Sequence, residues 1–157
     1  RIAPDYKQTG GPLMQISSRF TIAVHALICM EAFKDQYKVT SELLASSVNV
    51  NPVVIRRLLQ QLKKAGLVRV QRGSGGAEIA KPLEEITLLD VYNAVNCVET
   101  GQLFHFHENP NQKCPVGRNI HAILDQRLDA IQNAMEREMR AVTLRDVMAD
   151  AEKLIHS

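Results

Sequence analysis

Apolar residues recur at spacings of three and four along most of the chain, and this pattern predicts a mainly helical fold. In the first patterned segment, for example, Phe20, Ala23 and Leu27 fall on one side of a helix. Polar capping residues precede several of these segments, as Asn51 does before Pro52. The predicted helices cover about residues 15–33, 41–48, 52–65, 87–98, 118–141 and 144–155.

A hairpin signal interrupts this helical pattern after the third predicted helix. Runs at residues 67–72 and 77–81 predict two short strands, and the glycine-rich GSGG between them suits a tight connection. Gly66 supplies the helix stop just before the first strand. Three helices followed by a hairpin indicate a winged helix-turn-helix domain, so the expected class is mainly α with a small β-hairpin.

Cations are concentrated in the third predicted helix and the hairpin. The segment 43–77 contains six Lys or Arg and no Asp or Glu, whereas the whole chain carries +2, so the remainder carries −4. Clustered cations attract a polyanion such as DNA, although a solvated basic face is the alternative. The six residues are Arg56, Arg57, Lys63, Lys64, Arg69 and Arg72.

The third predicted helix has an exposed side that suits base recognition. Arginine can bind guanine through two hydrogen bonds, glutamine suits adenine, and a valine methyl can contact thymine. We therefore expect Val53, Arg56, Arg57 and Gln60 to meet base edges in the major groove, and Lys64 to contact a phosphate. The opposite, apolar side consists of Ile55, Leu58, Leu59 and Leu62.

The glycine turn of the hairpin is the candidate wing. A tip without side chains can approach a sugar-phosphate backbone closely while Arg72 reaches into the minor groove. The same glycines could instead cradle a nucleotide phosphate. They lie between two strands, however, and lack the Lys-Ser/Thr pair of a P-loop.

Four segments of the chain carry a resemblance to a known family: ISSRFTIAVHAL, NVNPVVIRRLLQQLKKAGLV, RGSGGAEIAKPLEEITLLDVYNAV and CPVGRNIHAIL. Over about residues 14–155 the chain resembles the IscR-related Rrf-two family of bacterial winged-helix transcription regulators, and its YwnA-like branch in particular. The resemblance implies a dimeric repressor or activator that binds double-stranded DNA.

The resemblance also implies roles for individual residues. It makes residues 53–60 the major-groove reader and gives Arg72 and Ser74 the wing contact. Arg19 corresponds to a position near the DNA backbone. We expect further DNA contacts at the start of the second predicted helix, from Thr40 and Ser41.

The long predicted helix from Arg118 to Ala141 has one narrow apolar stripe along a length of about 36 Å. Such a stripe can pack on its own domain or on a second copy of the chain, and the length favours the second copy. The resemblance likewise implies a dimer interface here. The stripe consists of Ile120, Leu124, Leu128, Ile131, Met135 and Met139.

These observations divide the chain into parts. We interpret the patternless start as vector-derived sequence, with a mobile native arm as the alternative. The expected parts are this arm at 1–13, a winged helix-turn-helix DNA-binding domain at 14–99, a loop at 100–117, and a dimerisation helix with a terminal helix at 118–157.

The cysteines and histidines raise the question of a sensor. The resemblance extends to redox sensors of the family, in which three closely spaced cysteines hold an iron-sulphur cluster. This chain departs from that pattern, because no cysteine lies between Cys97 and Cys114. Cys114, at the start of a predicted helix, is a candidate thiol switch. We expect no cofactor and no metal site, although His105, His107 and His121 with Cys114 offer ligand types.

The sequence therefore predicts a sequence-specific transcription regulator, a repressor, that binds a pseudo-palindromic operator as a homodimer. No catalytic constellation accompanies these features, so we expect no enzyme. Irregular cysteine spacing and the lack of a secretory signal or an apolar run of membrane-spanning length favour a soluble cytoplasmic protein. Alternatives are a winged-helix protein-interaction module and a thiol- or metal-responsive form of the regulator.

Overall fold

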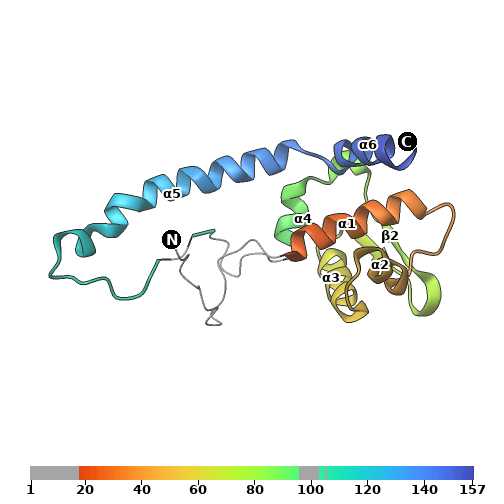
Figure 1. The fold of residues 1–157 in the computed structure, drawn as a ribbon, viewed down its shortest axis with the longest axis horizontal. Coiled ribbons are helices and arrows are strands. Elements are labelled where there is room, and N and C mark those ends of the chain that lie inside the picture. Colours follow the sequence, from red (N-terminus) through yellow and green to blue (C-terminus); the bar gives the residue numbers. More distant parts are fainter. Residues whose placement is uncertain (1–17, 96–102, 105) are drawn as a thin grey trace, which may run out of the picture.

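The computed structural model describes residues 18–95, 103–104 and 106–157, so the predicted arm at 1–13 lies outside them. The mainly helical fold with a small antiparallel hairpin confirms the expected class (Figure 1). The elements are α1 (Ser18–Phe33), α2 (Ser41–Val48), α3 (Pro52–Lys64), β1 (Val68–Val70), the 3₁₀ turn η1 (Gly73–Gly75), β2 (Ala77–Ile79), the 3₁₀ turn η2 (Leu83–Glu85), α4 (Leu88–Ala94), α5 (Pro115–Ala141) and α6 (Leu144–Ile155).

Local capping contacts determine where α2 and α3 begin. The Thr40 hydroxyl accepts the Leu43 N–H at 3.2 Å at the start of α2. The Asn51 side chain accepts the Val53 N–H at 2.9 Å, and Pro52 then occupies the first turn of α3. Each contact satisfies an amide that the helix itself leaves free, which confirms both predicted helix starts.

Two capping boxes set the starts of α4 and α6. Thr87 and Asp90 exchange hydrogen bonds of 3.1 and 2.9 Å at the start of α4. Thr143 and Asp146 do the same at 3.2 and 2.8 Å at the start of α6. A Thr followed three residues later by an acid suits this exchange, because each side chain accepts a backbone N–H of the other residue.

The hydrophobic core lies between α1, α2, α3, the hairpin, α4 and α6. The apolar side of α3 is buried against α2 and β1, as its periodicity predicted. The largest fully buried side chains are Leu27, Met30, Leu44, Ile55, Leu58, Leu62, Val68, Ile86, Val91, Val95, Leu144 and Met148.

The hairpin is shorter than the runs 67–72 and 77–81 predicted, because the chain turns back through η1. Its register pairs Val68 with Ile79 and Val70 with Ala77. The Ala77 N–H donates to the Val39 carbonyl at 2.8 Å, which fastens β2 to the segment before α2. Gly76 has φ +81°, and a Cβ there would lie 3.0 Å from the Val39 carbonyl oxygen, so this close approach requires glycine.

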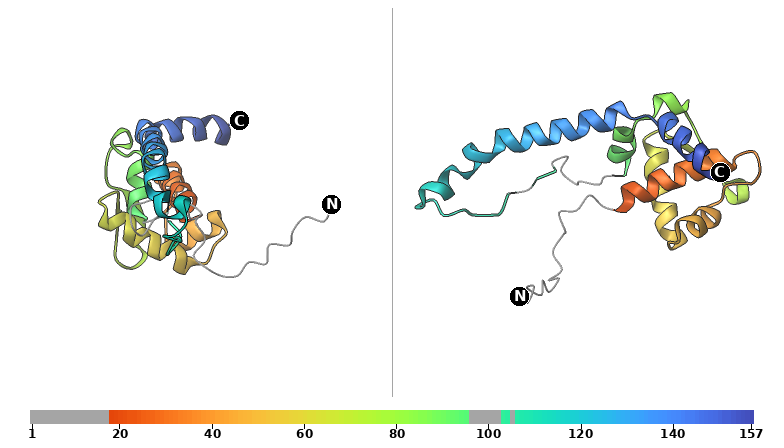
Figure 2. Two further views of the ribbon diagram at one scale, coloured as in Figure 1. Left: turned by 90° about the vertical axis from the view of Figure 1, so that its left-hand side faces the viewer. Right: turned by 45° about the horizontal axis from the view of Figure 1, so that its top comes forward.

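The helix α5 leaves the compact part of the molecule, while α6 returns to it (Figures 1 and 2). Backbone bonds from Leu88 N–H to Val142 (2.9 Å) and from Leu144 N–H to Ile86 (2.7 Å) join the end of α5 to the core. The sequence grouped α6 with the long helix, but α6 contacts α1 and η2. Its packing makes it part of the core rather than an extension of α5.

The described part of the chain contains no helix that is both long and apolar enough to cross a membrane.

Candidate nucleic-acid interface

The exposed side of α3 carries the residues predicted to read bases. Arg56, Arg57 and Gln60 are exposed, and half of the Val53 surface (50%) is accessible although valine is apolar. Lys64, in the last turn, is also exposed. The apolar partners on the other side of α3 fix this orientation, because each is less than a twentieth exposed.

A groove of about 350 Å³ runs between the start of α2, the exposed side of α3 and the tip of the hairpin. It brings together Thr40, Ser41, Arg56 and Gln60 of the predicted contacts with backbone of the predicted wing. The lining residues are Thr40, Ser41, Glu42, Arg56, Leu59, Gln60, Val70, Gln71, Gly73, Gly76 and Ala77. The groove therefore connects the two parts of the molecule that the sequence assigned to separate DNA grooves.

Arg56 is not a free cation, because its Nη2 donates to Glu42 Oε1 at 3.0 Å. Glu42 lies one residue before the acid-free segment 43–77, so the charge pattern of the sequence missed it. Its own backbone N–H, then the Arg56 guanidinium and the Ser41 hydroxyl, lower the pKa of the Glu42 carboxyl. Among the residues that the structure describes, Glu42 is thus the one acidic side chain lining the groove.

A second ion pair crosses the hairpin, where Arg69 Nε donates to Glu78 Oε1 at 3.0 Å. The two residues face each other in the strand register. Glu78 follows the acid-free segment directly. Of the six clustered cations, four form no ion pair with any residue that the structure describes: Arg57, Lys63, Lys64 and Arg72.

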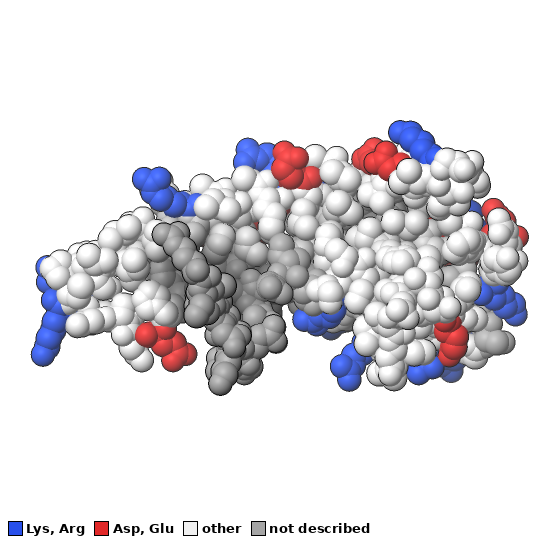
Figure 3. Space-filling view, in the orientation of Figure 1, with Lys and Arg blue, Asp and Glu red and all other residues white. Residues whose placement is uncertain are grey.

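The remaining predicted contacts lie around this surface. Arg72 is exposed immediately before η1, and Ser74 is within η1. Arg19, in the first turn of α1, is partly buried and does not line the groove. Figure 3 shows Lys and Arg side chains along the edge of the compact part where α2 and α3 lie in Figure 1, with acidic side chains among them.

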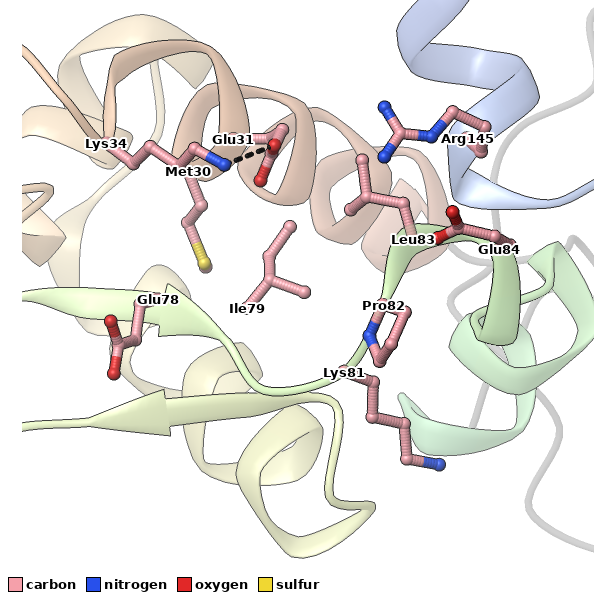
Figure 4. Close-up of a pocket in the computed structure, with 10 residues that line it drawn as sticks. All are labelled: Met30, Glu31, Lys34, Glu78, Ile79, Lys81, Pro82, Leu83, Glu84 and Arg145. Atoms are coloured by element: carbon pink, nitrogen blue, oxygen red, sulfur yellow. Dashed lines mark hydrogen bonds and ion pairs between the residues drawn. The ribbon is translucent and has the colours of Figure 1, made fainter.

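A separate cavity of about 480 Å³ lies between α1, β2, η2 and the start of α6 (Figure 4). Lys34 and Glu31 form an ion pair of 2.6 Å at its rim, and Arg145 extends over Leu83. None of its lining residues belongs to the groove or to the predicted DNA contacts. The cavity is therefore a different surface from the candidate interface.

The predicted thiol switch, Cys114, is the residue before α5, which begins at Pro115 rather than near Arg118. The backbone N–H groups of Gly117 and then Val116, in the first turn of α5, lower the pKa of the Cys114 thiol. The side chain is partly exposed, whereas Cys29 in α1 is buried. The loop predicted at 100–117 therefore ends at this cysteine.

The comparisons with known proteins agree with this geometry. The model of the Rrf2 family, described as iron-dependent transcriptional regulators, matches residues 16–150. The candidate HTH-type transcriptional regulator YwnA of Bacillus subtilis is 45% identical over 135 residues, which is 85% of this chain and 96% of YwnA. A solved structure of a candidate DNA-binding protein is 39% identical, with a TM-score of 0.65, and the match covers 83% of this chain and 99% of that one.

A likeness of fold extends to more distant relatives. The structure of IscR from T. potens is 18% identical to this chain, with a TM-score of 0.65, and the match covers 89% of this chain and 90% of IscR.

The iron in the family description would need His, Cys, Asp or Glu ligands. Within residues 18–95, 103–104 and 106–157, no three such side chains gather closely enough to hold a metal ion. Cys97 and His105, two of the ligand types noted in the sequence, lie outside these ranges. The described residues thus provide no iron site.

The family model spans most of the chain, and YwnA matches over nearly its full length. The family and the matched relatives are transcription regulators and not enzymes. The chain belongs to the Rrf2 family of winged-helix, DNA-binding transcription regulators.

Proposed function

We propose that this regulator binds a pseudo-palindromic operator as a homodimer and acts as a repressor. The observation that carries the proposal is the exposed basic side of α3, which meets the wing across one groove. A helix with this surface suits the major groove, and a hairpin with a glycine tip suits the adjacent backbone and minor groove. Residues 14–99 then act as the DNA-binding domain.

Within this proposal the predicted contacts divide into two kinds. Val53, Arg56, Arg57 and Gln60 meet base edges and select the sequence. The others hold the protein on the sugar-phosphate backbone or in the minor groove and contribute affinity. This second set consists of Arg19, Thr40, Ser41, Lys64, Arg72 and Ser74.

The homodimer rests on α5. Its 27 residues, about 40 Å of helix, include none that is buried, although an apolar stripe runs along it. Ile131 in that stripe is 53% exposed. A second copy that packs on the stripe removes this apolar surface from water and presents two reading helices to two half-sites.

Repression is the regulatory direction in this proposal, with the operator lying over the promoter. A dimer whose two reading helices occupy successive major grooves has half-sites about one helical turn of DNA apart, and it covers the DNA between them. Bound over a promoter, it blocks access of the polymerase without any additional contact. In a reporter assay with the operator across the promoter, we expect transcription to rise when the regulator is deleted.

The experiment that tests base reading starts with selection of bound duplexes from a random pool. Arg57→Ala should relax preference at one base pair by about 1–3 kcal/mol, because arginine recognises guanine through two hydrogen bonds. Lys64→Ala should weaken binding to selected and random DNA alike, since a phosphate contact carries no sequence information. Affinities are measured for both duplexes over a salt series.

The Arg57→Ala and Lys64→Ala variants together also define the result that would contradict the proposal. Equal losses on selected and random duplexes for both variants would refute the division into reading and backbone contacts. Failure of the full-length protein to enrich any sequence would refute operator binding and would favour a protein-interaction role for the basic surface. A steep fall of affinity with salt is expected throughout, because cations displace the counterions of DNA.

A further inference from the structure

The ion pair between Glu42 and Arg56 joins the two helices of the helix-turn-helix. Glu42 is the second residue of α2, and its two carboxylate oxygens have different partners. Oε1 accepts from Arg56 Nη2 at 3.0 Å, and Oε2 accepts from the Ser41 hydroxyl at 3.1 Å. The carboxylate is therefore held from both sides, and it in turn restrains the guanidinium of a predicted base reader.

This arrangement leaves Arg56 able to bind a base. A guanidinium has five N–H donors, and the contact with Glu42 uses one nitrogen. The side chain of Arg56 is 56% exposed and that of Glu42 is 65% exposed, so DNA can reach the pair. Restricting the rotamers of a long side chain before binding lowers the entropy cost of the contact that it makes.

The Glu42 carboxylate also disfavours binding to DNA that lacks the base recognised by Arg56. Glu42 lines the groove together with Ser41, Gln60 and the glycines of the wing, where phosphates would approach. Its negative charge repels phosphate, and the repulsion is offset when Arg56 gains a guanine edge. Discrimination by a repulsive element beside an attractive one is a general route to specificity.

We propose that Glu42 is a specificity-determining positioning residue, which orients Arg56 toward one base pair and disfavours binding to other sequences. This inference rests on the proposed function, because it assumes that α3 enters the major groove. Glu42 itself need not touch a base, since it acts through Arg56 and through its charge.

The hairpin supplies a matched control. Arg69 and Glu78 form an exposed ion pair of the same 3.0 Å length, with side chains 63% and 52% exposed. Neither residue lines the groove. Glu42→Gln and Glu78→Gln therefore remove the same charge from equivalent pairs, and only the first changes the setting of a proposed base reader.

The test measures the affinity of the full-length protein for a selected duplex and for a random duplex of equal length at one salt concentration. Glu42→Gln should bind the random duplex about threefold more tightly or better, because one repulsive charge is lost. Its ratio of selected to random affinity should fall by about tenfold. Glu78→Gln should shift both affinities by the same factor and keep the ratio of the unmodified protein.

The Arg56→Ala background distinguishes an action of Glu42 through Arg56 from a purely structural role of Glu42. In that background, Glu42→Gln should leave the affinity ratio unchanged, because without Arg56 the charge of Glu42 repels the phosphates of both duplexes alike. An unchanged ratio in Glu42→Gln alone, or an equal fall in Glu78→Gln, would overturn the inference. A parent protein that shows no preference between the duplexes would refute the proposed function instead.

Discussion

The helices α3 and α5 are both amphipathic, yet the molecule treats their apolar sides in opposite ways. In α3 the apolar side is buried, and Leu62 has no exposed surface. In α5 no residue is buried, and Ile131 remains 53% exposed. The sequence periodicity of the two helices differs little, so the difference arises from what the rest of the chain places against each helix.

This comparison separates folding from assembly. The core around α3 closes within one chain, because α2, β1 and α4 pack on α3, and α1 and α6 contribute to the same hydrophobic cluster. The contacts of α5 with the compact part are made with α4, near its C-terminal end. A helix of this kind retains apolar side chains that are only partly covered by the described residues, and in the proposed function a second copy covers the rest.

The largest expected effect concerns the α3 side of the comparison. Leu62→Ala should reduce the free energy of unfolding by about 2–5 kcal/mol, because it removes buried methyl groups and leaves a cavity. Urea denaturation followed by circular dichroism measures this change. An unfolding transition equal to that of the parent protein at the same protein concentration would contradict it.

The next effect concerns α5. Ile131→Asp should raise the dissociation constant of the proposed dimer by about a hundredfold or more, because a carboxylate would be buried without a partner. Sedimentation equilibrium measures the mass across a concentration series. Asn133→Asp is the matched control, since Asn133 is exposed and lies on the opposite side of the helix. Equal behaviour of the two variants would exclude the stripe as the interface.

The smallest expected effect is a difference in thiol reactivity between Cys29, in the core, and Cys114, at the start of α5. Cys114 should react with iodoacetamide at neutral pH on the order of ten times faster than Cys29, because its thiol pKa is lowered and Cys29 is buried. Peptide mass spectrometry follows each site separately. The difference should disappear in urea, and equal rates in the native protein would contradict the assigned environments.

Features that depend on near neighbours in the sequence were predictable. Asn51 with Pro52, and the Thr87–Asp90 box, act within three residues, so the chain needs no distant partner to form them. The burial of the apolar side of α3 followed from helical periodicity in the same way. The start of α5 was misjudged by a few residues, because Pro115 was interpreted as loop although proline suits the first turn of a helix.

Features that depend on distant residues were not predictable. Arg56 and Glu42 are separated by fourteen positions, and only the packing of α2 on α3 brings them within 3.0 Å. The return of α6 to the core is similar, because its apolar periodicity does not say which surface covers it. Both depend on the relative placement of elements, which single-sequence patterns do not encode.

The sequence by itself determined the helices, their caps, the glycine-bearing hairpin and the basic exposed side of α3, since periodicity and capping chemistry act over a few residues. The tertiary structure decided which cations are paired, which helices share a core and that the described residues cover the apolar stripe of α5 only in part. Ion pairing and burial depend on distances between elements, and those distances exist only after the chain has folded.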